Sequence, residues 1–130
     1  MKIFVSYSRR DAGDFANQLH TYLSNFKHDI FTDGDSIRTG EVWSNTIETN
    51  ISNCDIFVVI VTFGALHSPH VEREVLQAQK ENKKIIPCFF RGINPSKIKW
   101  GLDKIQGLEF FDKYELVRDL YSKIEKLFSY

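Results

Sequence analysis

The chain has 130 residues, and its 17 basic and 17 acidic side chains give a formal net charge of zero. This length is typical of one domain with its own core. The 42% hydrophobic and 26% charged content excludes a disordered chain and a membrane protein. A balanced charge produces no strong attraction to phosphate backbones or anionic lipid, so we expect neither nucleic acid nor a membrane surface as the main partner. We predict one domain spanning residues 1–130.

The first residues predict a cytoplasmic protein. Met1 to Tyr7 lack the long apolar region and cleavage site of a secretion signal, and no stretch of the chain reaches the length of a membrane span. Cys54 and Cys88 lack C-x-x-C spacing and each lies beside a strand-like run. This favours buried, reduced thiols over a disulfide or a metal site.

In the first half of the chain, β-like runs alternate with segments of helical period. The predicted elements are a strand over Lys2 to Tyr7, a helix over Asp11 to Phe26, a strand over Asp29 to Thr32 and a short helix over Val42 to Ile51. The apolar stripe of the first helix consists of Phe15, Ala16, Leu19, Leu23 and Phe26, and Asp11 or Asp14 can serve its N-terminal end. Asp33 to Gly40, with two glycines and short polar residues, reads as an exposed loop.

The second half continues the alternation. Asp55 to Val61 is a continuous β-branched run, typical of a central strand buried on both faces. Ser68 and Pro69 predict the N-cap and first position of a helix that runs to about Asn82. The remaining predicted elements are a strand over Ile85 to Phe90, a loop over Arg91 to Gly107 with a helical turn around Lys97 to Trp100, an edge strand over Leu108 to Phe111, and a closing helix over Tyr114 to Phe128.

This alternation predicts an α/β fold, a flavodoxin-like three-layer sandwich with a central five-stranded parallel sheet of order 2-1-3-4-5 and helices on both faces. In such sheets ligands bind beyond the carboxyl ends of the strands where strand order reverses, here between the first and third strands. The polar, aromatic and basic groups expected there come from Tyr7 to Arg10, Asp33 to Gly40 and Thr62 to Gly64.

Glu74 is the carboxylate that the helical period brings nearest to this crevice. On the helix after Ser68, the inward stripe is Val71, Val75 and Ala78, and Glu74 falls on its shoulder, while Glu72 and Arg73 lie nearer the solvent. Glu74 can therefore point into the crevice. The alternative is that it pairs with a nearby Arg or Lys and supports the helix.

Several other kinds of site are excluded. A phosphoacceptor domain of this topology needs an acidic pair after the first strand and an Asp ending the third, where this chain has Ser8-Arg9 and Thr62. Asp33-x-Asp35 lacks the remaining ligands and glycine of a calcium loop, and the chain has no Walker loop and no G-x-G-x-x-G. His67-x-x-His70 lacks companion ligands, so we expect no metal site.

The chain resembles the Toll/interleukin-1 receptor (TIR) domain family over essentially its whole length. Ile3 to Asp11 resembles the opening box of TIR domains, and Asp33 to Gly40 resembles their BB loop. Cys54 to Thr62 resembles their central strand, and Ser68 to Ala78 the helix that carries the glutamate of catalytic members. The order and spacing of these segments together make the resemblance specific.

Among TIR domains the chain is most similar to NAD+-cleaving prokaryotic members, because Glu74 stands at the catalytic position. The resemblance implies cleavage of the nicotinamide–ribose bond of NAD+ as substrate, with no separate cofactor. Catalytic members often carry Trp four residues before the glutamate, and this chain has His70. The implied substrate-binding residues, with the aromatic ones stacking on rings and the arginines meeting the pyrophosphate, are Tyr7, Ser8, Arg9, Arg10, Asp33, Trp43, Phe63 and His70.

Each of these assignments has a structural alternative. Tyr7 and Trp43 can simply pack in the core, the arginines can pair with Asp11 or Asp14, and Asp33 can shape its loop or contact another subunit. The implied reaction needs few catalytic groups, because nicotinamide leaves as a neutral base and needs no general acid. One carboxylate facing the oxocarbenium-like ribose is sufficient.

The resemblance also implies self-association through TIR–TIR contacts that include the Asp33 to Gly40 loop, and signalling in immunity or anti-phage defence. Two alternatives stay open: a non-catalytic adaptor that only binds other TIR domains, and a related nucleoside-processing enzyme on a similar sheet. The sequence does not distinguish ADP-ribose from cyclic or base-exchanged products.

Overall fold

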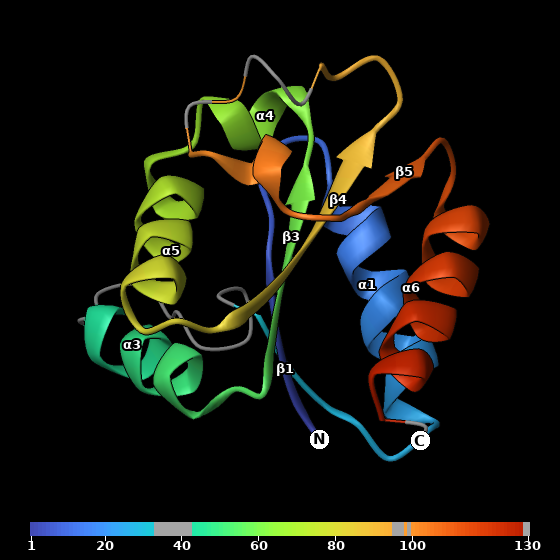
Figure 1. Cartoon of the computed structure of the whole chain (residues 1–130), viewed down its shortest axis with the longest axis horizontal. Coiled ribbons are helices and arrows are strands. Elements are labelled where there is room, and N and C mark those ends of the chain that lie inside the picture. The colour runs from blue at the N-terminus through green and yellow to red at the C-terminus, as the bar shows by residue number, and fades with distance from the viewer. Residues whose placement is uncertain (33–42, 95–97, 99, 129–130) are drawn as a thin grey trace.

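A computed structural model describes residues 1–32, 43–94, 98 and 100–128 of the chain (Figure 1). Its parallel strands form a 5-stranded sheet of order β2-β1-β3-β4-β5, which confirms the predicted flavodoxin-like α/β fold. The strands are β1 (Lys2–Ser6), β2 (Asp29–Thr32), β3 (Ile56–Val61), β4 (Lys84–Phe90) and β5 (Leu108–Phe110). Because β1 lies between β2 and β3, strand order reverses beside it, as predicted.

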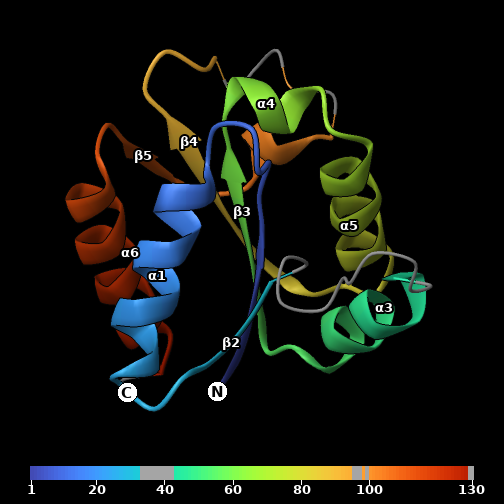
Figure 2. The ribbon, with the colours of Figure 1, turned by 180° about the vertical axis from the view of Figure 1, so that it is seen from behind.

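Helices cover both faces of the sheet. Helices α1 (Gly13–Ser24) and α6 (Lys113–Phe128) lie on one face, and α3 (Trp43–Asn53) and α5 (Pro69–Lys80) lie on the other (Figures 1 and 2). A one-turn helix, α4 (Phe63–Leu66), follows β3 at the carboxyl edge of the sheet, and a 3₁₀ turn, η2 (Leu102–Lys104), precedes β5. None of the helices in these described ranges combines the length and apolar character that crossing a membrane requires.

Two apolar clusters, one on each face of the sheet, form the core. Side chains alternate along a strand, so Ile56, Val58 and Ile60 of β3 join the cluster under α1 and α6. Phe57, Val59 and Val61 join the cluster under α3 and α5. All these β3 side chains are at most 1% exposed, as expected for a central strand covered on both sides.

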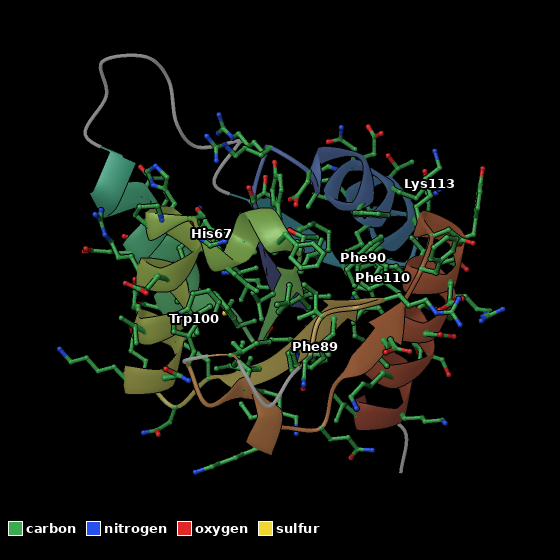
Figure 3. The ribbon with its side chains drawn as sticks, turned by 90° about the horizontal axis from the view of Figure 1, so that it is seen from above. His67, Phe89, Phe90, Trp100, Phe110 and Lys113 are labelled. Carbon is green, nitrogen blue, oxygen red and sulfur yellow. The ribbon has the colours of Figure 1, made fainter. Side chains whose placement is uncertain are left out.

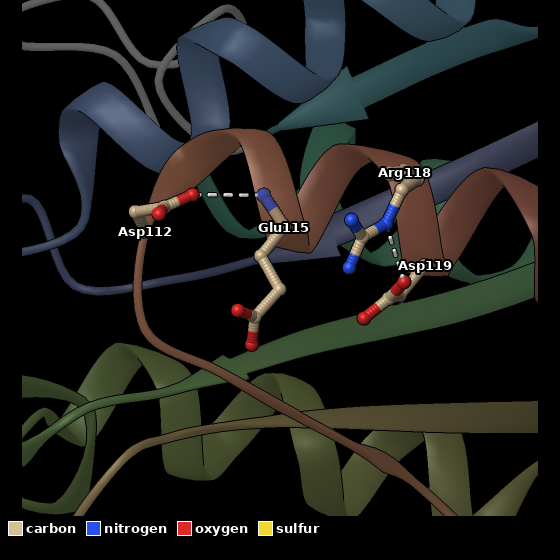
Figure 4. A network of polar contacts seen from close by, with 4 residues as sticks. All are labelled: Asp112, Glu115, Arg118 and Asp119. Carbon is tan, nitrogen blue, oxygen red and sulfur yellow. Dashed lines mark hydrogen bonds and ion pairs between the residues drawn. The ribbon is translucent and has the colours of Figure 1, made fainter.

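Local side-chain hydrogen bonds fix the starts of α5 and α6. Ser68 is the N-cap of α5 and its Oγ accepts a hydrogen bond from the Val71 backbone N–H at 3.3 Å, with Pro69 next, as predicted. At the start of α6, the Asp112 carboxylate accepts a hydrogen bond from the Glu115 backbone N–H at 2.9 Å (Figure 4). Asp14 lies in the first turn of α1, where a negative charge is favourable.

Three details differ from the predictions or fall outside the structure. Phe26 does not belong to the buried stripe of α1, because the helix ends at Ser24 and the Phe26 side chain is 42% exposed, resting on the ring of Tyr121. Helix α4 was not predicted, since four residues are too few to show a period. The predicted turn around Lys97 to Trp100 and the Asp33 to Gly40 loop include residues outside the described ranges.

The cysteines are free and buried, as predicted. Burial raises the pKa of the Cys54 thiol to about 11 and that of the Cys88 thiol to about 12, because a thiolate would lose its hydration. Since the thiolate is the reactive form, we expect neither thiol to react with an aromatic disulfide reagent at pH 8 in the folded protein. Both should react once the chain is unfolded in guanidinium chloride. Fast reaction of either thiol without denaturant would contradict this placement.

Candidate functional site

A cleft of about 380 Å³ opens at the carboxyl end of β1, where strand order reverses. One wall is the loop after β1 and the other is the junction between α4 and α5. Figure 3 looks along the sheet and shows His67 at this junction, beside α4. The lining residues are Tyr7, Ser8, Arg9, Arg10, His67, Ser68, Pro69 and His70. The structure therefore brings together five of the residues predicted from sequence, namely Tyr7, Ser8, Arg9, Arg10 and His70.

Glu74 lies behind this cleft rather than in its wall. It follows His70 by one turn of α5, and its side chain is 1% exposed. The Ser6 hydroxyl, which is itself fully buried at the end of β1, donates a 2.7 Å hydrogen bond to Glu74 Oε1. The carboxylate is therefore buried more deeply than the predicted shoulder position, because Ser6 draws it inward between β1 and α5.

Ser6 and Glu74 are each close in sequence to a residue that lines the cleft. Ser6 immediately precedes Tyr7, and Glu74 stands one helical turn after His70. A carboxylate is expensive to bury unless it is hydrogen-bonded. A buried carboxylate close to a cleft marks a candidate functional site.

Asp11 fixes the shape of the loop that forms one wall. Its carboxylate accepts hydrogen bonds from the Thr62 hydroxyl and from the Gly64 backbone N–H, both at 2.7 Å. The Ser8 carbonyl in turn accepts a 2.9 Å hydrogen bond from the Ala12 backbone N–H. These hydrogen bonds connect the loop after β1 to the end of β3. Asp11 therefore interacts with the start of α4 and not, as one prediction had it, with the N-terminus of α1.

The close approach of the Asp11 carboxylate leaves no room for a side chain at Gly64. A Cβ added at Gly64 would lie 2.5 Å from Asp11 Oδ1 and 2.8 Å from Ser8 Oγ. We expect Gly64→Ala to lower the free energy of unfolding by about 1–3 kcal/mol, because the Asp11 carboxylate must leave its hydrogen bonds. In an Asp11→Ala background the same substitution should cost measurably less. Equal costs in the two backgrounds, measured by urea denaturation, would show that the Asp11 contact is not what constrains Gly64.

A second cleft of about 410 Å³ shares Tyr7 and Arg9 with the first, and includes Thr32 at the end of β2. Tyr7 is 8% exposed, so its ring is packed in the core while part of its surface reaches both clefts. Two adjoining hollows at the ends of β1 and β2 can accommodate two parts of one extended ligand.

The other predicted residues are Phe63, Asp33 and Trp43, and only the Phe63 side chain is described. Phe63 is 59% exposed on α4 and does not line the first cleft. Asp33 and the side chain of Trp43 lie outside the part of the chain that the structure describes. Sequence reasoning weighed His67 only as a metal ligand, and overlooked Ser6 as a partner of Glu74. Over the described ranges, no group of three or more His, Cys, Asp or Glu side chains is arranged to hold a metal ion.

Charge in the first cleft is one-sided. Arg9 and Arg10 are exposed on one wall, His67 and His70 are exposed on the other, and the described residues that line the cleft include no carboxylate. The cleft of this electrically neutral chain is therefore suited to an anionic ligand.

Comparisons with known proteins agree with this architecture. The chain resembles the TIR domain of the Toll-related receptor TRR-2 from Hydra magnipapillata, with 17% identity, TM-score 0.76, and coverage of 95% of this chain and 98% of that one. It is similar to the TIR domains of the activated Roq1 resistosome, with 15% identity, TM-score 0.79, and coverage of 94% and 98%. It is also similar to the CMP N-glycosidase BcmB from Clostridium botulinum, with 16% identity, TM-score 0.72, and coverage of 92% and 98%.

At these identities the structural likenesses establish the fold. No curated protein sequence matches the chain. The sequence model described as "TIR domain" matches residues 3–125, which is nearly the whole chain. The protein therefore belongs to the TIR domain family.

Proposed function

We propose that this TIR domain cleaves the nicotinamide–ribose bond of NAD+, with Glu74 as the catalytic carboxylate. The observation that carries the proposal is the buried Glu74, held by Ser6 directly behind a cationic cleft at the switch point of the sheet. The products are nicotinamide and ADP-ribose or a cyclic isomer of it.

The chemistry requires little beyond this carboxylate. The nicotinamide ring of NAD+ is already positively charged, so it departs as a neutral base without protonation. Charge then develops on the ribose, and a nearby carboxylate stabilises an oxocarbenium-like transition state. A water-poor surrounding strengthens this stabilisation, because the effective dielectric constant there is low.

Because Glu74 is buried, we propose that its side chain moves when the substrate binds. The Glu74 side chain rotates from Ser6 toward the cleft when the ribose occupies it, and the wall residues that must yield are Tyr7 and His70. The Ser6 hydrogen bond holds the carboxylate in a single resting position until then.

The fold likeness to a CMP N-glycosidase suggests a second candidate substrate. Cleavage of CMP also breaks a bond between ribose and a base, and a one-sided cationic cleft suits its phosphate. Cleavage of CMP differs from cleavage of NAD+ in one requirement. Cytosine is neutral in the substrate, so its departure requires a proton. The non-catalytic adaptor is the remaining alternative.

We further propose that the domain works as a self-associated assembly in immune or anti-phage signalling. Support comes from the fold likeness to the TIR domains of an activated resistosome. Activity should then rise more steeply than linearly with protein concentration.

The test is to incubate the protein with NAD+, and separately with CMP, at a series of protein concentrations with and without a crowding agent. Nicotinamide and cytosine are followed by chromatography. We expect nicotinamide from NAD+. Release of cytosine alone would move the assignment to the nucleotide N-glycosidase. Release of neither base at high protein concentration would favour the adaptor.

A further inference from the structure

Strand β4 is longer than its neighbour β5 and extends past it at the amino end. The pairing of the two strands begins at Cys88 and Leu108, so residues 84–87 of β4 have no partner in β5 (Figure 1). Strand β5 ends the strand order, and no described strand lies beyond it. The sheet therefore has a notch at the amino end of β4, whereas the first cleft lies at the carboxyl end of the parallel strands.

The peptide group of Ile85 faces this notch. Along a parallel strand, the N–H and C=O groups of successive residues point alternately to the two sides. The Arg91 N–H donates to the Phe110 carbonyl of β5 at 2.8 Å. The Pro87 carbonyl lies on the same side, since a Cβ added at Gly107 would overlap its oxygen. Ile85 is separated from both by an even number of residues, so its N–H and C=O point to this side too, where β5 does not reach.

A hollow of about 540 Å³ lies at the notch, between the start of β4, the segment that leads into β5, and α6. Its floor is partly apolar. Leu108 and Leu127 pack against the cluster under α1 and α6, and Ile105 packs against the cluster under α3 and α5. The hollow therefore offers apolar surface on both faces of the sheet beside an unpaired stretch of strand.

Three lysines surround the hollow. Lys84 begins β4, and Lys123 and Lys126 lie about one turn apart on α6. None of the three forms an ion pair with a residue that the structure describes. Asp119 is the one carboxylate among the described lining residues, and Arg118 Nε donates a hydrogen bond to it at 3.0 Å (Figure 4). The rim therefore carries an excess of positive charge.

We propose that this notch binds an extended acidic segment of another protein, which adds to the sheet beside the amino end of β4. The unpaired main-chain groups of a sheet edge supply affinity for an added strand, and its alternating side chains supply specificity. Ile86 and Cys88 pack on the α6 face, so alternation places Lys84 on that face as well, with the two α6 lysines. Every second side chain of the bound segment is therefore acidic, and the others are apolar and contact Ile105.

The proposal is independent of the proposed reaction, because the notch and the first cleft lie at opposite ends of the sheet. Lysines at a sheet edge also have a purely protective role, in which they prevent pairing with other chains. The two roles make different predictions. Protective lysines disfavour every added strand, whereas a binding site selects the acidic one.

The experiment measures binding of the fluorescently labelled acidic peptide EVEVEV by fluorescence anisotropy, with KVKVKV as its basic counterpart. We expect saturable binding of the acidic peptide alone, weakening as salt is added. The triple variant Lys84→Gln, Lys123→Gln, Lys126→Gln should bind it about tenfold more weakly, since each exposed charge pair contributes a factor of about two.

A matched control separates this site from the general charge of the protein. The triple variant Lys2→Gln, Lys80→Gln, Lys113→Gln removes the same charge from positions outside the hollow and should bind the acidic peptide like the unaltered protein.

A second readout tests the main-chain pairing. Hydrogen exchange followed by NMR should show slower exchange of the Ile85 N–H in the presence of the acidic peptide. The same peptide with methylated backbone nitrogens cannot donate to a strand, so it should bind at least about tenfold more weakly.

Three results would overturn the proposal. The first is equal binding of the acidic and basic peptides, or unchanged binding by the notch variant when circular dichroism shows it to be folded. The second is unchanged binding of the methylated peptide, which would reduce the interaction to charge attraction without an added strand. The third is loss of peptide binding as the protein concentration is raised, which would assign the notch to a second copy of the chain.

Discussion

Replacing Glu74 with glutamine should lower the rate of nicotinamide release by about two to three orders of magnitude. Glutamine keeps nearly the same shape, and its amide oxygen still accepts the hydrogen bond from Ser6 Oγ, which is 2.7 Å from Glu74 Oε1. The substitution replaces the acid with a neutral amide, which cannot supply the negative charge that the developing ribose cation requires. The loss should therefore appear in kcat more than in KM.

Stability measurements distinguish a catalytic Glu74 from a merely structural one. Removing a buried charge while keeping its hydrogen bond should leave the free energy of unfolding within about 1 kcal/mol of the original, or raise it. Glu72→Gln is the matched control, since Glu72 lies on the same helix and its carboxylate serves Trp100. Equal rates for Glu74→Gln and the unaltered protein would remove Glu74 from the mechanism.

Replacing Phe57 with alanine should lower the free energy of unfolding by about 3–5 kcal/mol, the cost of truncating a fully buried phenylalanine. Phe57 is 0% exposed at the centre of β3, and its ring stacks on Phe4 with centroids 5.6 Å apart and planes inclined by 4°. The cavity left behind is enclosed by two strands and the helices of that face, which restricts relaxation. Urea denaturation measures the change.

The same substitution at Phe63 provides the contrast. Phe63 is 59% exposed on α4, so Phe63→Ala should change stability by less than about 0.5 kcal/mol. If Phe63 stacks on a substrate ring, as the sequence predicted, the variant will raise KM without loss of stability. A loss of stability in Phe63→Ala as large as that in Phe57→Ala would contradict the exposed position of Phe63.

The sheet could be predicted because its signals are local. A β-branched run such as Ile56 to Val61 cannot be exposed on either face without cost, and Ser68-Pro69 determines a helix start through backbone chemistry alone. The predicted ends of the elements were less accurate than their existence and type. Phe26 continued the apolar period of α1 beyond the point where the chain turns, since Lys27 adopts a positive φ of 65° that ends any helical course.

The position of the cleft could also be predicted, because it follows from strand order. The burial of Glu74 and its hydrogen bond with Ser6 could not be predicted, since helical periodicity gives an angle around the helix and no distance from another element. Its partner Ser6 is 68 residues away. His67 could have been found from the sequence, because the Ser68 cap places residue 67 at the carboxyl edge of the sheet, on the same side as the residues after β1.

Three side-chain hydrogen bonds at the site join parts of the chain that are remote in sequence: Ser6 to Glu74 across 68 residues, Asp11 to Thr62 across 51 and Asp11 to Gly64 across 53. Joining such distant segments carries an entropic cost, which the parallel pairing of β1 with β3 and the apolar clusters on the two faces of the sheet offset. A ribosome-bound chain that has not yet released α5 therefore cannot bring Glu74 to Ser6. The proposed cleavage of NAD+ would begin only after the sheet has closed around its first strand.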